Sequence, residues 1–333
     1  MSKSNIGWCN YSWNPITGCY TNCEVCNSRQ IANNFAADYR LNISDDRCIK
    51  YSTDSDKPLF ILEKPFINQN GRALTTPFGF YCTYHKYRLN DLSKLNESRI
   101  IFVGSMADMF GEWVPDEWIK EIFEECKKYP QHHYLFLTRN CKRYLELFDK
   151  KILPSKNEVP NFWFGTTIDN GTALYFYSNR HNTFVNVEVT NNFEMKQTDL
   201  LVDWLIIGYK KGYKAIDMDL VRNWIANVLN AATKQNIPLF MDGSLNSIIK
   251  SEDFVQQMPD ALTQKTVVGK KKTLLYTKCS ICKTEDKKSN MRAILVREHR
   301  GESAKSLGYI CQDCYPEFEK GLKNGEDLGK RSN

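Results

Sequence analysis

The chain has 333 residues, of which 42% are hydrophobic, and this is ample for a large core. It contains no run of about 18 apolar residues that could cross a membrane, and its first 15 residues hold polar and aromatic breaks where a signal peptide needs an apolar stretch. Its 12 cysteines form two tight clusters plus scattered single residues, which favours metal ligation in a reducing compartment over disulfides. We therefore expect a cytoplasmic protein that does not span a membrane.

Charge is distributed unevenly along the chain. Residues 265–333 contain 16 Lys and Arg against 9 Asp and Glu, a net charge of +7, whereas the 264 residues before them carry −1. A basic C-terminal module on a nearly neutral body suggests an anionic partner, with nucleic acid first. Surface lysines in this number also occur for solubility alone.

The N-terminal region contains three cysteines with C-x₃-C-x₂-C spacing, namely Cys19, Cys23 and Cys26. Four thiolates would complete a zinc site or fully ligate an iron–sulfur cluster, whereas three on one short loop leave a metal position open for a cofactor. Two other interpretations stay open at this point. The cysteines could be small buried hydrophobes, or they could bind structural zinc with a distant fourth ligand such as Cys9 or Cys48.

Apolar runs bounded by turns recur after the cysteine loop, with helix-like stretches between them. A polar and aromatic segment at about 37–96 comes first, and we interpret it as an insertion that could wall the site. The predicted strands then span 100–104, 133–138, 161–167, 184–189, 203–208 and 237–241, and the predicted helices span 116–128, 142–148 and 219–233. Strands that alternate with helices indicate βα units and a parallel sheet, whose functional residues lie just beyond the strand ends.

The C-terminal region contains two C-x₂-C pairs, Cys279 with Cys282 and Cys311 with Cys314. Four thiolates at such spacing suit tetrahedral zinc, and a strand-like run at 292–297 could form a hairpin beneath the metal. We expect a zinc-ribbon or treble-clef-like module over 265–320, followed by a flexible tail at 321–333. A second iron–sulfur cluster is the competing interpretation. Lysines at 270–272, 287 and 288 would contact phosphates without reading sequence.

The cysteine loop carries a resemblance to a known superfamily. Its run Trp13-Asn14-Pro15-Ile16-Thr17-Gly18-Cys19 is similar to the Trp-Asn-Pro-x-Thr-Gly-Cys signature of a phage-associated family whose reaction is not assigned, and the likeness covers about residues 6–245. More distantly, this loop and the strand ends at 102–110, 135–139 and 164–169 resemble spore photoproduct lyase and the so-called DNA repair photolyases. These are radical S-adenosylmethionine (SAM) enzymes. The chain departs from their pattern at Val25, usually aromatic, and at Arg139, usually lysine.

The resemblance implies a fold, cofactors and a reaction. Residues 1–264 would form a partial (βα)6-type parallel barrel that holds a four-iron four-sulfur cluster on the three N-terminal cysteines, with SAM on the open iron. A 5′-deoxyadenosyl radical would abstract hydrogen from a nucleobase or nucleotide for repair or modification. The electron would come from a reductant such as flavodoxin or ferredoxin.

The resemblance also implies roles for residues at the strand ends. Ser105 and Asp108 would hold the methionine amine of SAM, Arg139 its carboxylate, and Thr167 a ribose or carboxylate oxygen. Glu188 joins this set because a carboxylate on a buried strand usually has a partner or a role. The plain alternative is that Ser105 and Thr167 cap helices and that Asp108 closes a turn.

A second function class competes with the enzyme. In it, both cysteine groups are structural and the chain is a zinc-stabilised protein that binds nucleic acid without catalysis. The two classes differ in a simple property, because an iron–sulfur protein purified without air is brown and a zinc protein is colourless.

Overall fold

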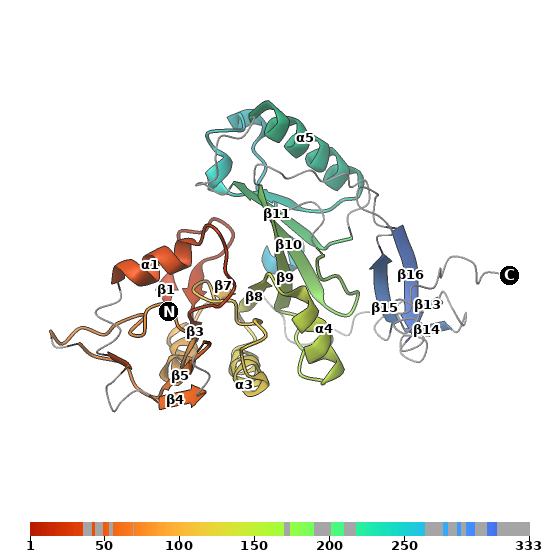
Figure 1. Ribbon diagram of the computed structural model, residues 1–333. Helices are drawn as coiled ribbons and strands as arrows, with labels where there is room; N and C mark the ends of the chain where they lie inside the picture. Colours follow the sequence, from red (N-terminus) through yellow and green to blue (C-terminus); the bar gives the residue numbers. More distant parts are fainter. Residues whose placement is uncertain are drawn as a thin grey trace.

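The computed structural model describes residues 1–35, 42–43, 49–52, 56–68, 70–169, 174–189, 201–209 and 218–263, and the backbone of four short strands between 276 and 311 (Figure 1). Within these residues the main element is a curled eight-stranded sheet shaped like half a barrel, in the order β1-β2-β7-β8-β9-β10-β11-β12. β1 runs antiparallel to β2, and every other neighbouring pair in this sheet is parallel. The prediction of an α/β fold with a parallel sheet is confirmed.

The predicted elements match the observed ones to within two residues at each end. The strands of the main sheet are β1 (Ser2–Lys3), β2 (Tyr11–Trp13), β7 (Ile100–Val103), β8 (His133–Thr138), β9 (Phe162–Ile168), β10 (Asn182–Val189), β11 (Trp204–Tyr209) and β12 (Leu239–Met241). The helices that correspond to predicted ones are α3 (Asp116–Lys127), α4 (Cys141–Asp149) and α5 (Met218–Lys234). The alternation is less regular than expected, since the described residues 174–181 between β9 and β10 contain no helix.

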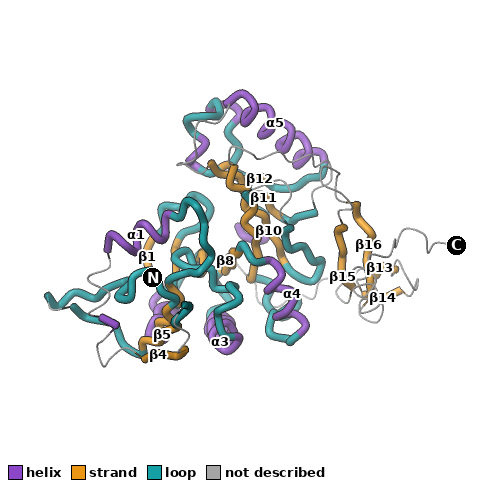
Figure 2. The backbone as a smooth tube through the Cα atoms, viewed as in Figure 1, coloured by secondary structure: helices purple, strands orange, loops and turns teal. Residues whose placement is uncertain are grey.

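Successive side chains of each strand point to opposite faces of the sheet and pack into two different cores. On the outer face, residues such as Phe136 and Phe164 pack against α3 and α4, and Val187 and Ile207 pack against α5. Figure 2 shows these helices along the outside of the curled sheet. Away from their carboxyl ends most of these strands are therefore apolar on both faces, which is why they appear in the sequence as apolar runs.

The inner face carries a separate aromatic cluster. Its largest members are Trp8, Phe102, Trp163, Phe184, Trp204 and Phe240. Gly165 pairs with Phe184 across β9 and β10, and a Cβ at position 165 would lie only 2.3 Å from the Phe184 ring. The absence of a side chain at Gly165 is what allows this ring to fill the interior of the half-barrel.

A second sheet lies before β7 in the chain, and the sequence did not predict it. Its strands, in the order β3-β6-β5-β4, are β3 (Ile16–Thr17), β6 (Thr83–His85), β5 (Leu59–Leu62) and β4 (Ile49–Ser52). The 3₁₀ helix η1 (Lys86–Lys94) follows β6. The expected insertion at 37–96 thus contributes three strands, and Phe60, Phe66 and Phe78 form part of a small core of its own.

The remaining elements are short. They comprise α1 (Asn27–Phe35), η2 (Gly243–Leu245), η3 (Ser251–Asp253), α6 (Asp260–Thr263), and the strands β13 (Tyr276–Lys278), β14 (Glu285–Lys287), β15 (Met291–Val296) and β16 (Lys305–Cys311). β13 pairs with β14, and β15 with β16, in both cases antiparallel. Among the described residues, no helix combines the length and the apolar character needed to cross a bilayer.

The predicted zinc ligands fall largely outside this description. Cys279, Cys282 and Cys314 lie outside the described residues, as does the tail at 321–333. Cys311 is the last residue of β16, and its side chain is not among those described. The zinc module and the domain boundary at 264 therefore stay predictions.

The buried His181 makes stability dependent on pH. Its Nδ1 lies 3.1 Å from the Ser178 hydroxyl, and its ring packs against Phe148, Phe164 and Phe176. Burial, with a smaller contribution from Arg180, lowers the pKa of His181 to about 3.

We expect stability to fall as the pH drops from about 6.5 toward 3, because in that window the unfolded chain binds a proton at His181 that the folded chain does not. The measurement is urea unfolding at pH 7 and pH 4.5. His181→Leu should lose less stability than the natural chain between these two pH values, by on the order of 1–3 kcal/mol. An equal loss in both proteins would show that His181 contributes nothing to the acid response.

Candidate functional site

The cysteine loop leaves the main sheet after β2 and turns sharply at Gly18. This residue has φ +83°, and a Cβ there would lie 2.1 Å from the Tyr81 carbonyl oxygen. The Gly18 amide donates to the Met106 carbonyl (2.9 Å), and the Cys19 amide donates to the Phe80 carbonyl (3.2 Å). Only glycine meets both the left-handed conformation and the close approach, so this turn explains the glycine of the Trp13–Cys19 run.

The other side chains of that run fix the turn to its surroundings. Asn14 accepts hydrogen bonds from the Ser105 hydroxyl (3.1 Å) and the Met106 amide (2.9 Å). Thr17 Oγ1 lies 2.8 Å from Nε2 of the buried His85, at the end of β6. The loop is thereby joined to the segment after β7 and to the second sheet.

Arg88 and Trp13 complete this attachment. The Trp13 indole donates to the Arg88 carbonyl (2.9 Å), while the Arg88 guanidinium donates to the carbonyls of Asn14 and Thr75, both at 2.8 Å. Arg88 is only 8% exposed, so these bonds are shielded from water. The expected insertion therefore holds the cysteine loop in place as well as flanking it.

Backbone amides contact two of the three thiols. The Thr21 amide donates to Cys19 Sγ and the Arg29 amide donates to Cys26 Sγ, each at 3.4 Å. Cys26 directly precedes α1, whose N-terminal end favours negative charge. Burial raises the pKa of the Cys19 thiol, and hydrogen bonds from Thr21 oppose this rise.

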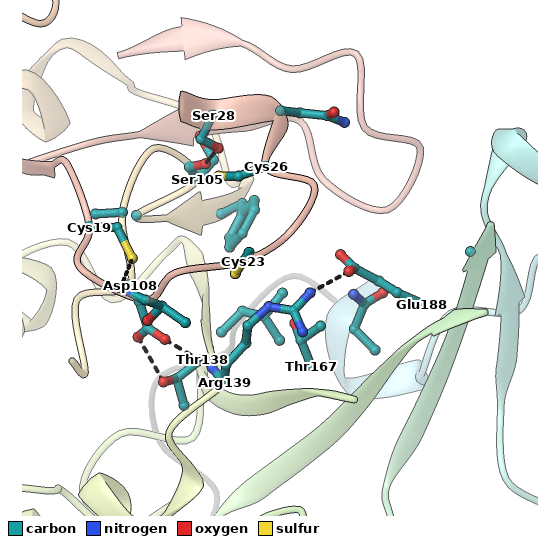
Figure 3. Close-up of a pocket in the computed structure, with 18 of the residues that line it drawn as sticks. Cys19, Cys23, Cys26, Ser28, Ser105, Asp108, Thr138, Arg139, Thr167 and Glu188 are labelled. Carbon is teal, nitrogen blue, oxygen red and sulfur yellow. Dashed lines mark hydrogen bonds and ion pairs between the residues drawn. The ribbon is translucent and has the colours of Figure 1, made fainter. Parts of the chain in front are cut away.

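A cavity of about 500 Å³ lies beneath the loop, at the carboxyl ends of the strands of the main sheet. All eight residues that the sequence assigned to the cluster and to SAM line it, as Figure 3 shows: Cys19, Cys23, Cys26, Ser105, Asp108, Arg139, Thr167 and Glu188. Phe80 from the expected insertion also lines this cavity. The structure thus brings these residues to one place, while their roles stay predictions.

Arg139 crosses the cavity between the cysteine loop and β10 (Figure 3). Its guanidinium donates to Asp169 (2.7 Å) and forms an ion pair with Glu188, and these side chains are between a fifth and a third exposed. Burial alone would lower the pKa of Arg139, but the carboxylates of Glu188 and Asp169 raise it. Glu188 was expected to have a partner or a role because it lies on a buried strand, and its partner is Arg139.

Asp108 and Ser105 make mainly internal contacts. The buried Asp108 carboxylate accepts hydrogen bonds from the Thr138 hydroxyl (2.7 Å), the Arg139 amide (3.0 Å) and the Phe110 amide (3.1 Å). Burial raises its pKa, although these hydrogen bonds oppose the rise. Asp108 therefore links the ends of β7 and β8 and positions Arg139, in line with the structural alternative. Ser105 likewise uses its hydroxyl on Asn14.

Five further residues line the cavity on β10, on β11 and just after β12, and the sequence reasoning missed them. They are Asn186, Gly208, Tyr209, Asp242 and Ser244. Asn186 could have been predicted, because it stands two residues before Glu188 and therefore lies on the same face of that strand. Asp242 and Ser244 directly follow a predicted strand, where the rule for parallel sheets directs attention.

In the part of the chain that is described, no three His, Cys, Asp or Glu side chains converge on a point where one metal ion could bind. Cys9, considered as a fourth ligand, lies in the inner-face cluster and donates a hydrogen bond from its thiol to the Ser4 hydroxyl (3.2 Å). Burial raises the pKa of the Cys9 thiol to about 11. Cys48, the other candidate, lies outside the described residues. Three thiols on one loop could still hold a multi-iron group, in which each thiolate binds a different iron.

Replacing Gly18 with alanine should destabilise the protein by more than the conformational penalty of a positive φ, which is about 1–2 kcal/mol. The additional loss comes from the contact with the Tyr81 carbonyl. Gly71→Ala is the matched control, because Gly71 has φ +74° and open space around its missing Cβ. Urea unfolding of both variants measures the difference, and equal losses would mean that the close approach is relaxed at no cost.

Comparison with known proteins gives a family and no function. No curated protein and no solved structure matches this chain. One family model, described as "Protein of unknown function (DUF5131)", matches residues 3–261 and so covers more than half of the sequence. The chain therefore belongs to the DUF5131 family.

Proposed function

We propose that this chain is a radical SAM enzyme that acts on a nucleobase or nucleotide in the repair or modification of nucleic acid. The observation that carries the proposal is the shared cavity. Cys19, Cys23 and Cys26 line it together with polar residues from the ends of six parallel strands, β7 to β12. When bound, the cluster and SAM would supply a 5′-deoxyadenosyl radical that abstracts hydrogen from the substrate.

The surroundings of the thiols fit an iron–sulfur cluster. Amides of Thr21 and Arg29 donate to two of the sulfurs, and hydrogen bonds to sulfur are one of the means by which proteins set the potential of such a cluster. The loop is attached to two other segments, because Asn14 and Gly18 both bond to Met106 after β7 and Arg88 bonds to the Asn14 carbonyl. A rigid donor loop holds a multi-atom group without rearrangement.

The charge of the cavity fits SAM, which carries a sulfonium and an ammonium cation. Among the described residues that line the cavity, three are carboxylates, Asp108, Glu188 and Asp242, and one is a guanidinium, that of Arg139. Thiolates on the cysteine loop would add further negative charge. The described part of the cavity therefore favours a cation.

Arg139 is the residue that would hold the carboxylate of SAM. It is already paired with Asp169 and Glu188, so binding would exchange one internal carboxylate for the carboxylate of the ligand. Thr167 would bind a ribose or carboxylate oxygen, as the resemblance implies. Asp108 would act on SAM indirectly, because its carboxylate positions the backbone of Arg139.

The finer descriptions of the fold belong to the same proposal. The curled sheet would be the partial (βα)6 barrel of radical SAM enzymes, and the two C-x₂-C pairs would form a zinc-ribbon-like module. The net charge of +7 in residues 265–333 supports nucleic acid as the partner of that module. A flavodoxin or ferredoxin would supply the electron.

Replacing Cys19, Cys23 and Cys26 together with alanine should remove the iron and the brown colour from anaerobically purified protein, while any zinc stays bound. Iron analysis and the visible spectrum measure the loss. Cys141→Ala is the control, because Cys141 lies on α4 and does not line the cavity. Unchanged iron in the triple variant would contradict the proposal, and a colourless natural protein would favour the zinc-stabilised, non-catalytic alternative.

The C-terminal quartet should bind about one zinc per chain after aerobic purification, as expected for one four-thiolate site. Replacing Cys279 and Cys314 should remove this zinc and expose the tail to protease, because zinc binding supplies much of the folding energy of so small a module. Metal analysis and limited proteolysis measure both effects. Loss of iron with zinc retained in this variant would show that the two metal sites have been exchanged.

A further inference from the structure

The cavity has a second end, away from the thiols. Five residues form it, on β10, on β11 and after β12, and we call this surface the acceptor wall: Asn186, Glu188, Gly208, Asp242 and Ser244. Glu188 stands opposite Gly208 in the register of β10 and β11. Figure 3 places Arg139 between Cys23 and Glu188, so the guanidinium separates the thiol end from the acceptor wall.

Gly208 leaves open space in the acceptor wall because it has no side chain. A Cβ at this position would make only ordinary contacts, 3.5 Å from both Asp242 Cβ and Ser244 Oγ. Neither a positive φ nor a clash therefore requires glycine here, in contrast to Gly18 and Gly165. The missing side chain instead leaves room between Glu188 on β10 and Asp242 just after β12.

The polar atoms of the acceptor wall are mostly hydrogen-bond acceptors. Asp242 uses Oδ1 to accept from the Ser244 amide (2.9 Å), and Ser244 Oγ accepts from the Tyr209 amide (2.9 Å). The backbone of Asn186 pairs within the sheet, but its side-chain amide forms no hydrogen bond with any other described residue, so this amide can contribute both a donor and an acceptor to a ligand. Glu188 is paired with Arg139, whereas Asp242 keeps a second carboxylate oxygen that can accept from a group with N–H donors.

Apolar surface within the same cavity favours a flat group. The rings of Trp8 and Phe102 line the same cavity, with their centroids 4.9 Å apart. A volume of about 500 Å³ is in the ordinary range for a small-molecule site. A planar heterocycle could therefore contact aromatic surface while its edge donates to the wall.

We propose that the acceptor wall binds the reacting nucleobase and selects bases that carry an exocyclic amino group, as cytosine does and uracil does not. The inference rests on the proposed function and names the substrate class of the same cavity. The amino group donates to Asp242, in the way that carboxylates accept from the amino group of cytosine. Asn186 and Ser244 pair with the remaining edge of the base.

The test is the binding of cytidine and uridine to the full-length protein by calorimetry, since the two nucleosides differ at the base edge alone. Cytidine should bind at least about fivefold more tightly, the smallest discrimination expected of one good base contact. Asp242→Asn should remove or reverse this preference, because an amide can donate to the uracil oxygen. Asp253→Asn, which removes the same charge at an exposed position outside the cavity, should preserve it.

The substitution Gly208→Ala tests whether the open space at Gly208 is needed for binding the base. Its added methyl group has space in the fold, so the thermal midpoint should stay unchanged. Cytidine binding should weaken by about fivefold or more, which is the effect of losing one base contact. Gly243→Ala, where a Cβ would meet only Asn246 at 3.7 Å and which does not line the cavity, is the matched control. SAM binding measured in the same variants should stay within about twofold of the natural protein, well below the effect of a lost base contact.

Three results would overturn the inference. They are equal affinity for cytidine and uridine, no binding of either nucleoside, and a loss of SAM binding in Gly208→Ala as large as the loss of cytidine binding, which would assign the wall to the cofactor. Nucleoside binding needs no SAM cleavage. Natural protein that contains no iron after anaerobic purification but still prefers cytidine would therefore refute the radical SAM proposal and leave the base selectivity standing.

Discussion

The side chain of Asn14 is the contact on which the arrangement of the site depends. It accepts hydrogen bonds from both the Ser105 hydroxyl and the Met106 amide, and so ties the loop after β2 to the loop after β7. The thiols belong to the first of these loops, and the residues that face them belong to the ends of later strands. Their relative positions are set by this amide and by the backbone contact of Gly18 with Met106.

The sequence could predict most of the main sheet because its strands are buried on both faces. Runs such as 134–137 and 204–207 are continuously apolar, and they alternate with amphipathic helices at lengths typical of βα units. The second sheet escaped prediction for the opposite reason. Its strands have two to four residues, and β3 pairs with β6 across more than 60 residues of chain, so no local pattern marks them.

The site was predictable to the extent that topology determines it. Cys19, Cys23 and Cys26 are marked by their spacing, and the carboxyl ends of parallel strands meet at one edge, which brings Ser105, Asp108, Arg139, Thr167 and Glu188 to the same cavity. Pairings within the site were not predictable. Arg139 and Glu188 are 49 residues apart, and nothing local indicates that they form an ion pair. The internal hydrogen bonds of Asp108 depend on the same tertiary contacts.

The contact between Gly165 and Phe184 has a consequence for how the sequence of this family can vary. The phenylalanine ring occupies the space that any side chain at position 165 would need. A larger residue at 165 is therefore compatible with the half-barrel only if position 184 becomes smaller at the same time. The two positions, 19 residues apart in sequence and paired across β9 and β10, are constrained to change together or remain as they are.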